Sequence, residues 1–348
     1  MLAQRETTSR DDSDQRERRS VMYVGTQYNL PSDDDYRVLA QLGVNNVSQM
    51  PDSHPSEWNR ETLAAHKEKI ESFGLTLDLM RLPVDHAYID ANAPLGETVT
   101  YLLGDIPERE RHLDHLCQII RDCGEVGIPG VLYNINIIGV FRTESVQGRG
   151  GSINSSFNWE KADHDAPPGT AGTVSPEEQW ERIEYFLDRV VPVAEEARVR
   201  LACHPQDTYA PPGWRGVTTE MATVEGMKRF VQYHESPYHG LNFCQGTVSE
   251  MLERPGEEIY DVIRWFGERN KIFNVHFRNI KGGRLNFVEV FPDEGDVDML
   301  KAARVYKEVG YPYMLMPDHV PQISGENPSG VGFAFAYGYI QALIQAVN

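Results

Sequence analysis

Short apolar runs alternate with amphipathic helical patterns along most of the chain, and the alternation recurs eight times. Several runs are apolar at successive positions, which is typical of strands covered on both faces. Strands separated by helices favour a parallel sheet, and eight such units favour closure into a (β/α)₈ barrel. The predicted strands are Val21–Gly25, Val44–Val47, Leu75–Leu79, Gly130–Ile135, Val199–Cys203, Leu241–Cys244, Ile272–His276 and Tyr313–Met316.

Helical spacing of apolar residues fills the gaps between these runs. Ser175 precedes one helical pattern and Glu178 follows three residues later, which is the sequence signature of a capping box. The predicted helices are Ser32–Leu42, Asn59–Phe73, Glu108–Val126, Pro176–Ala197, Thr223–Tyr233, Ile259–Arg269 and Asp296–Val309.

The 348 residues suffice for one large barrel. We expect residues 21–348 to form a single catalytic TIM-barrel domain. The polar segment Met1–Ser20 is expected to be a flexible or disordered lead-in or an oligomer contact. Two long loops, His86–Pro107 after strand three and Phe141–Val174 after strand four, exceed what a minimal barrel needs. Long loops on this side of a barrel are typical of lids or substrate covers.

Composition restricts the partners and the compartment. The net charge of −19 opposes binding to nucleic acid or to an anionic membrane, although cations in a cleft still allow a small anionic substrate. No apolar stretch approaches the ~20 residues of a membrane span, and the N-terminus lacks the apolar core of a signal peptide. The four cysteines follow no zinc-ribbon spacing, so the sequence predicts a cytoplasmic protein.

Four successive predicted strands end in a residue that can bind a metal. These residues are His204, Cys244, His276 and Asp318, which lie 40, 32 and 42 residues apart. Each one alone is more often structural, since buried cysteines act as small apolar groups and aspartates after strands cap helices. Their joint occurrence is different, because the C-terminal ends of barrel strands meet at one mouth. The pattern predicts a mononuclear divalent-metal site.

Polar neighbours of these residues suggest substrate contacts. Arg278 lies two residues beyond His276 and could bind a carboxylate through its forked donors. His319 follows Asp318 and is a candidate general acid or base. Asp207 could orient a ligand or contact hydroxyls, and Tyr133 with Asn134 could donate to sugar hydroxyls. The alternative for Tyr133 is packing.

Seven ordered segments resemble the D-mannonate dehydratases, which are metal-dependent enzymes with a xylose-isomerase-like barrel. The resemblance extends from about residue 20 to the C-terminus and is most specific in the second half. The segments are Leu132-Tyr133-Asn134, Val191-Pro192-Val193-Ala194-Glu195-Glu196-Ala197, Cys203-His204-Pro205-Gln206-Asp207, Phe243-Cys244-Gln245-Gly246, Val275-His276-Phe277-Arg278-Asn279, Gly295-Asp296-Val297-Asp298-Met299 and Pro317-Asp318-His319.

The resemblance implies a hydro-lyase of glucuronate catabolism that converts D-mannonate to 2-keto-3-deoxy-D-gluconate with Mn²⁺ or Fe²⁺; Zn²⁺ and Co²⁺ also suit such a site. It places the metal on the four residues named above, the catalytic histidine on His319 and the catalytic arginine on Arg278. We also expect a homo-oligomer, a dimer or larger.

One family feature differs in this chain. The family places a catalytic tyrosine shortly after an Asn-Pro pair, whereas the first tyrosine after Asn327-Pro328 is Tyr337. Tyr337 is therefore the candidate second proton carrier, with packing on the last helix as its alternative. The open functional alternatives are a dehydratase for a related aldonate, a sugar isomerase or epimerase on the same barrel, and a non-catalytic sugar-acid binding protein.

Overall fold

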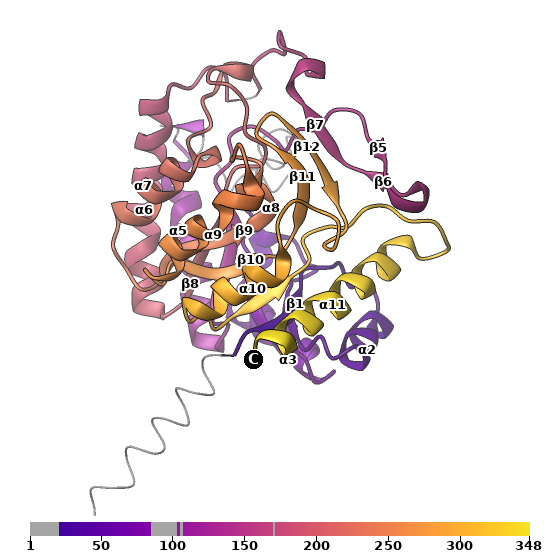
Figure 1. Ribbon diagram of the computed structural model, residues 1–348. Coiled ribbons are helices and arrows are strands. Elements are labelled where there is room, and N and C mark those ends of the chain that lie inside the picture. Colours follow the sequence, from indigo (N-terminus) through magenta and orange to yellow (C-terminus); the bar gives the residue numbers. More distant parts are fainter. Residues whose placement is uncertain (1–20, 85–102, 105–106, 170) are drawn as a thin grey trace, which may run out of the picture.

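The computed structural model describes residues 21–84, 103–104, 107–169 and 171–348 (Figure 1). The predicted lead-in Met1–Ser20 and most of the predicted loop His86–Pro107 lie outside these residues. Eight parallel strands close a barrel in the order β1-β13-β10-β9-β8-β4-β3-β2, which confirms the predicted fold. The barrel strands are β1 (Tyr23–Thr26), β2 (Asn46–Ser48), β3 (Thr76–Arg81), β4 (Gly130–Asn134), β8 (Arg200–His204), β9 (His239–Cys244), β10 (Ile272–His276) and β13 (Met314–Met316).

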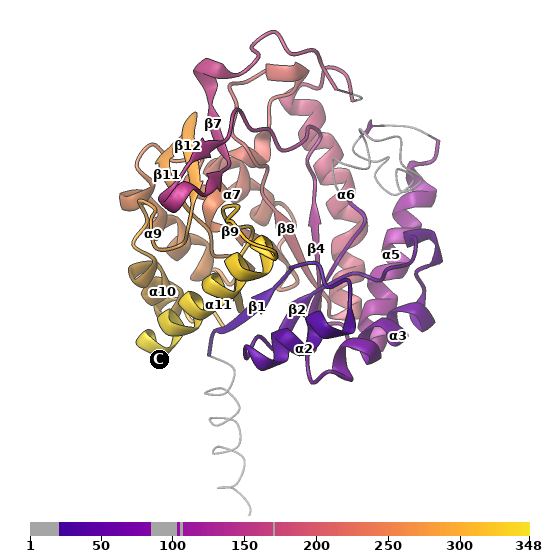
Figure 2. The ribbon, with the colours of Figure 1, turned by 90° about the vertical axis from the view of Figure 1, so that its right-hand side faces the viewer.

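Helices cover the outside of the strands in both views (Figures 1 and 2). The predicted capping box is present, because the Ser175 hydroxyl accepts from the Glu178 backbone N–H while the Glu178 carboxylate accepts from the Ser175 N–H. The helices are α2 (Asp33–Gln41), α3 (Arg60–Glu71), α5 (Arg109–Val126), α6 (Pro176–Ala197), α7 (Val224–Tyr233), α8 (Gln245–Ser249), α9 (Pro255–Gly267), α10 (Met299–Glu308) and α11 (Pro328–Val347).

Alternation along each strand decides which side chains enter the barrel. Leu201, Cys203 and Phe243 belong to the apolar core between strands and helices. Their chain neighbours therefore point the other way, into the barrel. His204 and Cys244 end their strands with this inward direction, so they reach the C-terminal mouth of the barrel.

A second sheet lies beyond the mouth and was not predicted from the sequence. A hairpin of β11 (Asn279–Gly283) and β12 (Asn286–Val290) begins three residues after the end of β10. β12 also pairs antiparallel with β7 (Ser156–Asn158), a strand inside the long predicted loop Phe141–Val174 (Figure 2). The same loop contributes a two-stranded sheet of β5 (Val146–Gln147) and β6 (Ile153–Asn154).

A small apolar core fastens this second sheet. Phe141, Phe157, Ile280 and Phe287 are buried together, and the rings of Phe157 and Phe287 are 6.0 Å apart. Because Phe141 and Phe157 come from the loop after β4 and the other two from the hairpin, the two insertions are held as one unit.

Helix α11 carries no charged residue, which is unusual in a chain that is 24% charged. By length and composition alone, it is the one described helix that could cross a membrane. One side of α11 is buried in the main core through Phe333, Tyr337 and Ile340, as in the core helix of a barrel. The other side of the helix exposes Val331 and Phe335.

Candidate active site

The four predicted metal ligands converge at the mouth of the barrel. One ligand atom from each of His204, Cys244, His276 and Asp318 lies within 4.8 Å of the others. Three of them are the last residues of the adjacent strands β8, β9 and β10, and Asp318 follows β13 by two residues. Cys244 and His276 are partners in the strand register, so their side chains start side by side.

Hydrogen bonds outside this ligand cluster orient two of its members. The Nδ1 atom of His204 is 2.7 Å from the Pro205 carbonyl oxygen and donates to it, which leaves Nε2 as the nitrogen for the ligand cluster. Gln27 donates from Nε2 to Oδ1 of Asp318 at 2.8 Å. Such outer hydrogen bonds fix the direction in which a ligand presents its donor atom.

Cys244 is a buried cysteine whose surroundings favour the thiolate. Burial and the Asp318 charge would raise its pKa, but the Arg278 charge and hydrogen bonds from His204 and His276 outweigh them and lower the pKa to about 5. The Thr247 hydroxyl lies 3.1 Å from the sulfur and its backbone nitrogen 3.4 Å away. The thiolate is the form that binds metals.

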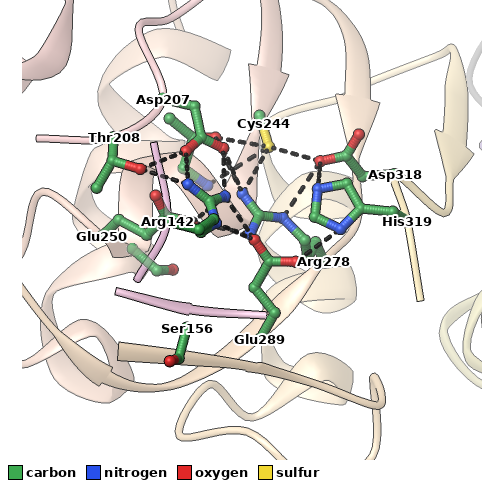
Figure 3. A network of polar contacts seen from close by, with 12 residues as sticks. Arg142, Ser156, Asp207, Thr208, Cys244, Glu250, Arg278, Glu289, Asp318 and His319 are labelled. Carbon is green, nitrogen blue, oxygen red and sulfur yellow. Dashed lines mark hydrogen bonds and ion pairs between the residues drawn. The ribbon is translucent and has the colours of Figure 1, made fainter. Parts of the chain in front are cut away.

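The arginine network lies directly above the ligand cluster and consists of Arg142, Asp207, Glu250, Arg278 and Glu289. Figure 3 shows the two guanidinium groups side by side between Asp207 and Glu289. Arg142 donates to Asp207 Oδ1 at 2.6 Å and to Glu289 Oε1 at 2.9 Å. Arg278 reaches Asp207 at 3.1 Å, and Glu250 and Glu289 at 2.8 Å each.

The carboxyl groups of the network differ in charge. Despite burial, the two arginines hold the pKa of Asp207 well below its usual range. Burial and the Asp207 charge raise the pKa of Glu250 well above its usual value, so this group takes up a proton more readily than the other two carboxyl groups. Glu289 has a pKa of about 2, because His319 and Arg278 outweigh its burial. Two arginines and two carboxylates therefore balance one another.

The charge balance within the arginine network determines whether the ligand cluster has negative charge left for a cation. The Cys244 sulfur and Oδ2 of Asp318 are 3.6 Å apart, and both groups carry negative charge when deprotonated. Asp207 and Glu289 offset much of the arginine charge, so two buried anions with two imidazoles beside them fit one divalent cation. The residues present thus suit a mononuclear metal with mixed nitrogen, sulfur and oxygen ligands.

Arg278 contacts protein carboxylates where a substrate carboxylate was expected. Its side chain is only 3% exposed, and besides the network it reaches Oδ2 of Asp318 at 3.2 Å. Because protein carboxylates already surround the guanidinium, the arrangement suits a group that holds Asp318 and Cys244 in place. Asp207 is likewise committed to Arg142 and Arg278 rather than open to sugar hydroxyls.

His319 lies at the edge of the site and remains open to solvent. Its side chain is 45% exposed, with Nδ1 2.6 Å from Oε2 of Glu289 and Nε2 3.3 Å from Oδ2 of Asp318. Burial lowers its pKa, but the charges of Glu289 and Asp318 outweigh this effect and raise the pKa to about 8. The geometry is that of an imidazole oriented by a carboxylate beside a metal site.

The structure corrects the expectation for Tyr133 and separates it from Asn134. Tyr133 packs against Phe186 of α6 with ring centroids 5.5 Å apart, inside the core between strands and helices. It cannot reach the mouth, because alternation turns it outward. Asn134 is opposite His204 in the strand register and therefore faces the barrel interior.

Tyr337 also lies away from the mouth, which corrects its expected role as proton carrier. It is buried between α11 and β1, where its hydroxyl is 2.6 Å from Oγ1 of Thr26. Burial raises its pKa above the usual value of a phenol. The residue packs on the barrel wall, and packing was the alternative interpretation that the sequence left open for it.

Sequence reasoning missed Arg142, Glu250, Glu289 and Gln27. Arg142 lies in the loop after β4 and Glu289 in β12, so their proximity depends on the pairing of β7 with β12. A charged residue inside a strand-like run, as in Asn286-Phe287-Val288-Glu289-Val290, is the one local signal that could have indicated Glu289.

Comparisons with known proteins agree on one family. The family model of D-mannonate dehydratase (UxuA) matches residues 169–348. A mannonate dehydratase from Thermotoga petrophila is 27% identical over 332 residues, covering 84% of this chain and 87% of the relative. Mannonate dehydratase 2 from Halalkalibacterium halodurans is 26% identical over 324 residues, covering 84% and 88%.

Solved structures share the fold. A mannonate dehydratase from Streptococcus suis superposes with a TM-score of 0.78 and 23% identity, covering 94% of this chain and 93% of the other. A xylose isomerase domain protein from Planctomyces limnophilus gives a TM-score of 0.60 at 15% identity, covering 94% and 98%. These likenesses support the barrel, and the family match extends over more than half of the chain. The chain therefore belongs to the D-mannonate dehydratase family, a family of metal-dependent hydro-lyases.

Proposed function

We propose that this protein removes water from D-mannonate to give 2-keto-3-deoxy-D-gluconate. The observation that carries the proposal is the ligand cluster at the barrel mouth, with His319 oriented beside it by Glu289. Dehydration of a sugar acid requires removal of the C2 proton and departure of the C3 hydroxyl. A site with a cation and an adjacent imidazole suits both demands.

His204, Cys244, His276 and Asp318 would hold one Mn²⁺ or Fe²⁺, and Zn²⁺ or Co²⁺ also suit a site with thiolate and imidazole ligands. When bound, such a cation supplies positive charge that stabilises the negative charge developing next to the substrate carboxylate. The cation also gives the anionic substrate a binding partner in a chain with a net charge of −19.

His319 is the group proposed to move a proton at C2 or C3. Its Nδ1 is held by Glu289, which leaves Nε2 as the nitrogen toward the Asp318 side of the site. Its exposure of 45% leaves room for contact with a substrate. Asn134, the register partner of His204, faces the barrel interior and is the proposed hydroxyl contact.

Arg278 and Asp207 act as positioning residues in this proposal. Arg278 holds Asp318 at 3.2 Å, and Asp207 in turn holds Arg278 at 3.1 Å. The pair thereby keeps a ligand carboxylate in a fixed direction, which a metal site requires of its surroundings.

A related aldonate is the second candidate substrate, and one observation favours it. The Tyr337 hydroxyl is committed to Thr26 on the barrel wall, so another group or a water must serve as the second proton carrier. A different acid changes which hydroxyl can leave, and hence which sugar acid reacts fastest.

A substrate panel tests the proposal. Metal-loaded protein is incubated with mannonate, gluconate and other five- and six-carbon aldonates, and 2-keto-3-deoxy acid is measured. We expect mannonate to react with a kcat/KM of ~10⁴ M⁻¹s⁻¹ or more. Keto-deoxy acid formed only from another aldonate supports the second candidate. A rearranged sugar without loss of water would indicate an isomerase or epimerase, and binding without turnover a sensor.

We further propose a cytoplasmic homo-oligomer. The uncharged helix α11 supports assembly, because its exposed side chains Val331 and Phe335 offer apolar surface that a second copy would bury. Sedimentation of wild-type protein and of Phe335→Asp would show whether this face takes part, because the added charge should shift the assembly toward monomer.

A further inference from the structure

Two buried amides lie one layer below the ligand cluster, inside the barrel. Asn242 precedes Cys244 by two residues on β9, and Asn274 precedes His276 by two on β10, so all four side chains face inward. Asn242 and Asn274 are partners in the strand register, and neither has any exposed surface. Polar groups buried this deeply need hydrogen-bond partners, and their arrangement is therefore informative.

The amides connect to a metal ligand in a short chain. Asn274 donates from Nδ2 to Oδ1 of Asn242 at 2.8 Å. The Nδ2 atom of Asn242 lies 3.1 Å from Nε2 of His276. The other ring nitrogen of His276, Nδ1, is 3.2 Å from Oδ1 of Asp318, on the side of the ligand cluster. Oδ1 of Asn274 has no hydrogen-bond partner among the described residues.

A neutral imidazole has one protonated nitrogen, and the nitrogen that binds a metal must be the other one. Nδ1 of His276 faces Asp318 and the ligand cluster, so Nε2 is the nitrogen that carries the proton when Nδ1 is a ligand. Nε2–H then needs an acceptor, and the amide of Asn242 is the group beside it. The atom of Asn242 facing Nε2 must then be oxygen rather than nitrogen.

An amide can meet this requirement without a change of shape, because its oxygen and its NH₂ group are nearly the same size. Rotation of Asn242 by half a turn would bring Oδ1 to Nε2 and turn Nδ2 toward Asn274. Asn274 would then have to present its own oxygen, the atom that now lacks a partner. The reversed orientation therefore gives Nε2–H an acceptor and gives Oδ1 of Asn274 a donor.

We propose that Asn242 and Asn274 are positioning residues that hold Nε2 of His276 as a donor, so that Nδ1 is available as a ligand. The inference rests on the metal site proposed above. Neither amide touches the substrate, so their effect is on metal affinity.

Metal affinity of four variants tests the proposal. The dissociation constant for Mn²⁺ is measured on metal-stripped full-length protein for Asn242→Leu, Asn242→Asp, Asn274→Leu and Asn274→Asp, with thermal unfolding recorded for each. Thr26→Val is the control, because it removes a buried hydroxyl outside the ligand cluster.

Asn242→Leu should weaken Mn²⁺ binding by about 10–100-fold, since Nε2–H loses its acceptor. Asn242→Asp should bind at least as tightly as wild type, because a carboxylate accepts from Nε2–H as in carboxylate–histidine–metal triads. Asn274→Asp should likewise retain affinity by accepting from Asn242, whereas Asn274→Leu should weaken it. Thr26→Val should bind like wild type.

The two substitutions at each position separate positioning from packing. A general packing defect would make leucine and aspartate equally harmful, and this result would overturn the proposal, as would wild-type affinity in Asn242→Leu. If Asn242→Leu does not fold, the Asn274 pair decides by the same contrast. Wild-type protein that binds no Mn²⁺, Fe²⁺, Co²⁺ or Zn²⁺ would instead remove the metal site and with it the proposed function.

Discussion

The ligand cluster and the arginine network lie within a few ångströms of each other, yet they have different origins. The cluster uses the ends of neighbouring barrel strands, so its geometry follows from the barrel itself. The network needs Arg142 from one insertion and Glu289 from another. The comparison indicates that the proposed metal ligands and the network that orients the groups around them come from different parts of the chain.

Removal of a ligand should have the largest effect. His276→Ala and Cys244→Ala should each lower metal affinity by more than ~100-fold, because loss of a direct ligand exceeds the usual effect of an outer partner. Metal content per chain after dialysis, measured by elemental analysis, should fall from about one to near zero. Full occupancy in both variants would contradict the proposed ligand set and with it the division between the two regions.

His319→Asn should have the next largest effect. We expect turnover to fall by roughly 10²–10⁴-fold while metal content stays at the wild-type value, because asparagine cannot transfer the proton. Steady-state kinetics with parallel metal analysis would check this. If the variant instead loses its metal and regains activity when metal is added, His319 is a member of the ligand cluster and not the proton-transfer residue.

Glu289→Gln should have an intermediate effect that originates in the network. Glutamine cannot carry the charge that holds Nδ1 of His319 at 2.6 Å, so kcat should fall by about 10–100-fold with little change in KM or metal content.

Glu250→Gln is the matched control for Glu289→Gln. Glu250 contacts the same arginine but has a raised pKa, so its substitution removes less negative charge than Glu289→Gln does. Equal losses in both variants would show that the network acts only through its packing.

Tyr337→Phe should have the smallest effect. Loss of the hydrogen bond to Thr26 should lower the free energy of unfolding by about 0.5–1.5 kcal/mol and leave kcat/KM unchanged. Denaturant unfolding together with steady-state kinetics would test both parts. A large fall in kcat/KM at unchanged stability would return Tyr337 to the catalytic groups.

The barrel and the ligand cluster were predictable because both depend on local patterns. A strand buried on both faces is apolar throughout, as in Met314–Met316, and its C-terminal end always faces the mouth. The predicted direction of the Tyr133 side chain was wrong, and the alternation of side chains along the strand shows why. His204 must face inward to be a ligand and Asn134 is its register partner, so Tyr133 must face outward.

The network was not predictable, because no local pattern specifies which distant segments pair. Ser156–Asn158 is only three residues long, and nothing in its sequence indicates that it pairs with Asn286–Val288, some 130 residues away. The role of Arg278 changed for the same reason. Its position after β10 was clear from the sequence, but the carboxyl groups that surround it come from distant segments. Asp207 follows β8, Glu250 follows α8 and Glu289 lies in β12.

The pairing of β7 with β12 has a consequence for the exchange of loops between related enzymes. A graft that transfers only the segment after β4 would leave the backbone donors and acceptors of β12 without their partner strand, and would separate Arg142 from Glu289. A graft of the hairpin alone would do the same in reverse. The two insertions therefore form a single transferable cassette, and chimeras that move residues 141–174 together with 279–290 should be the ones that keep their chemistry.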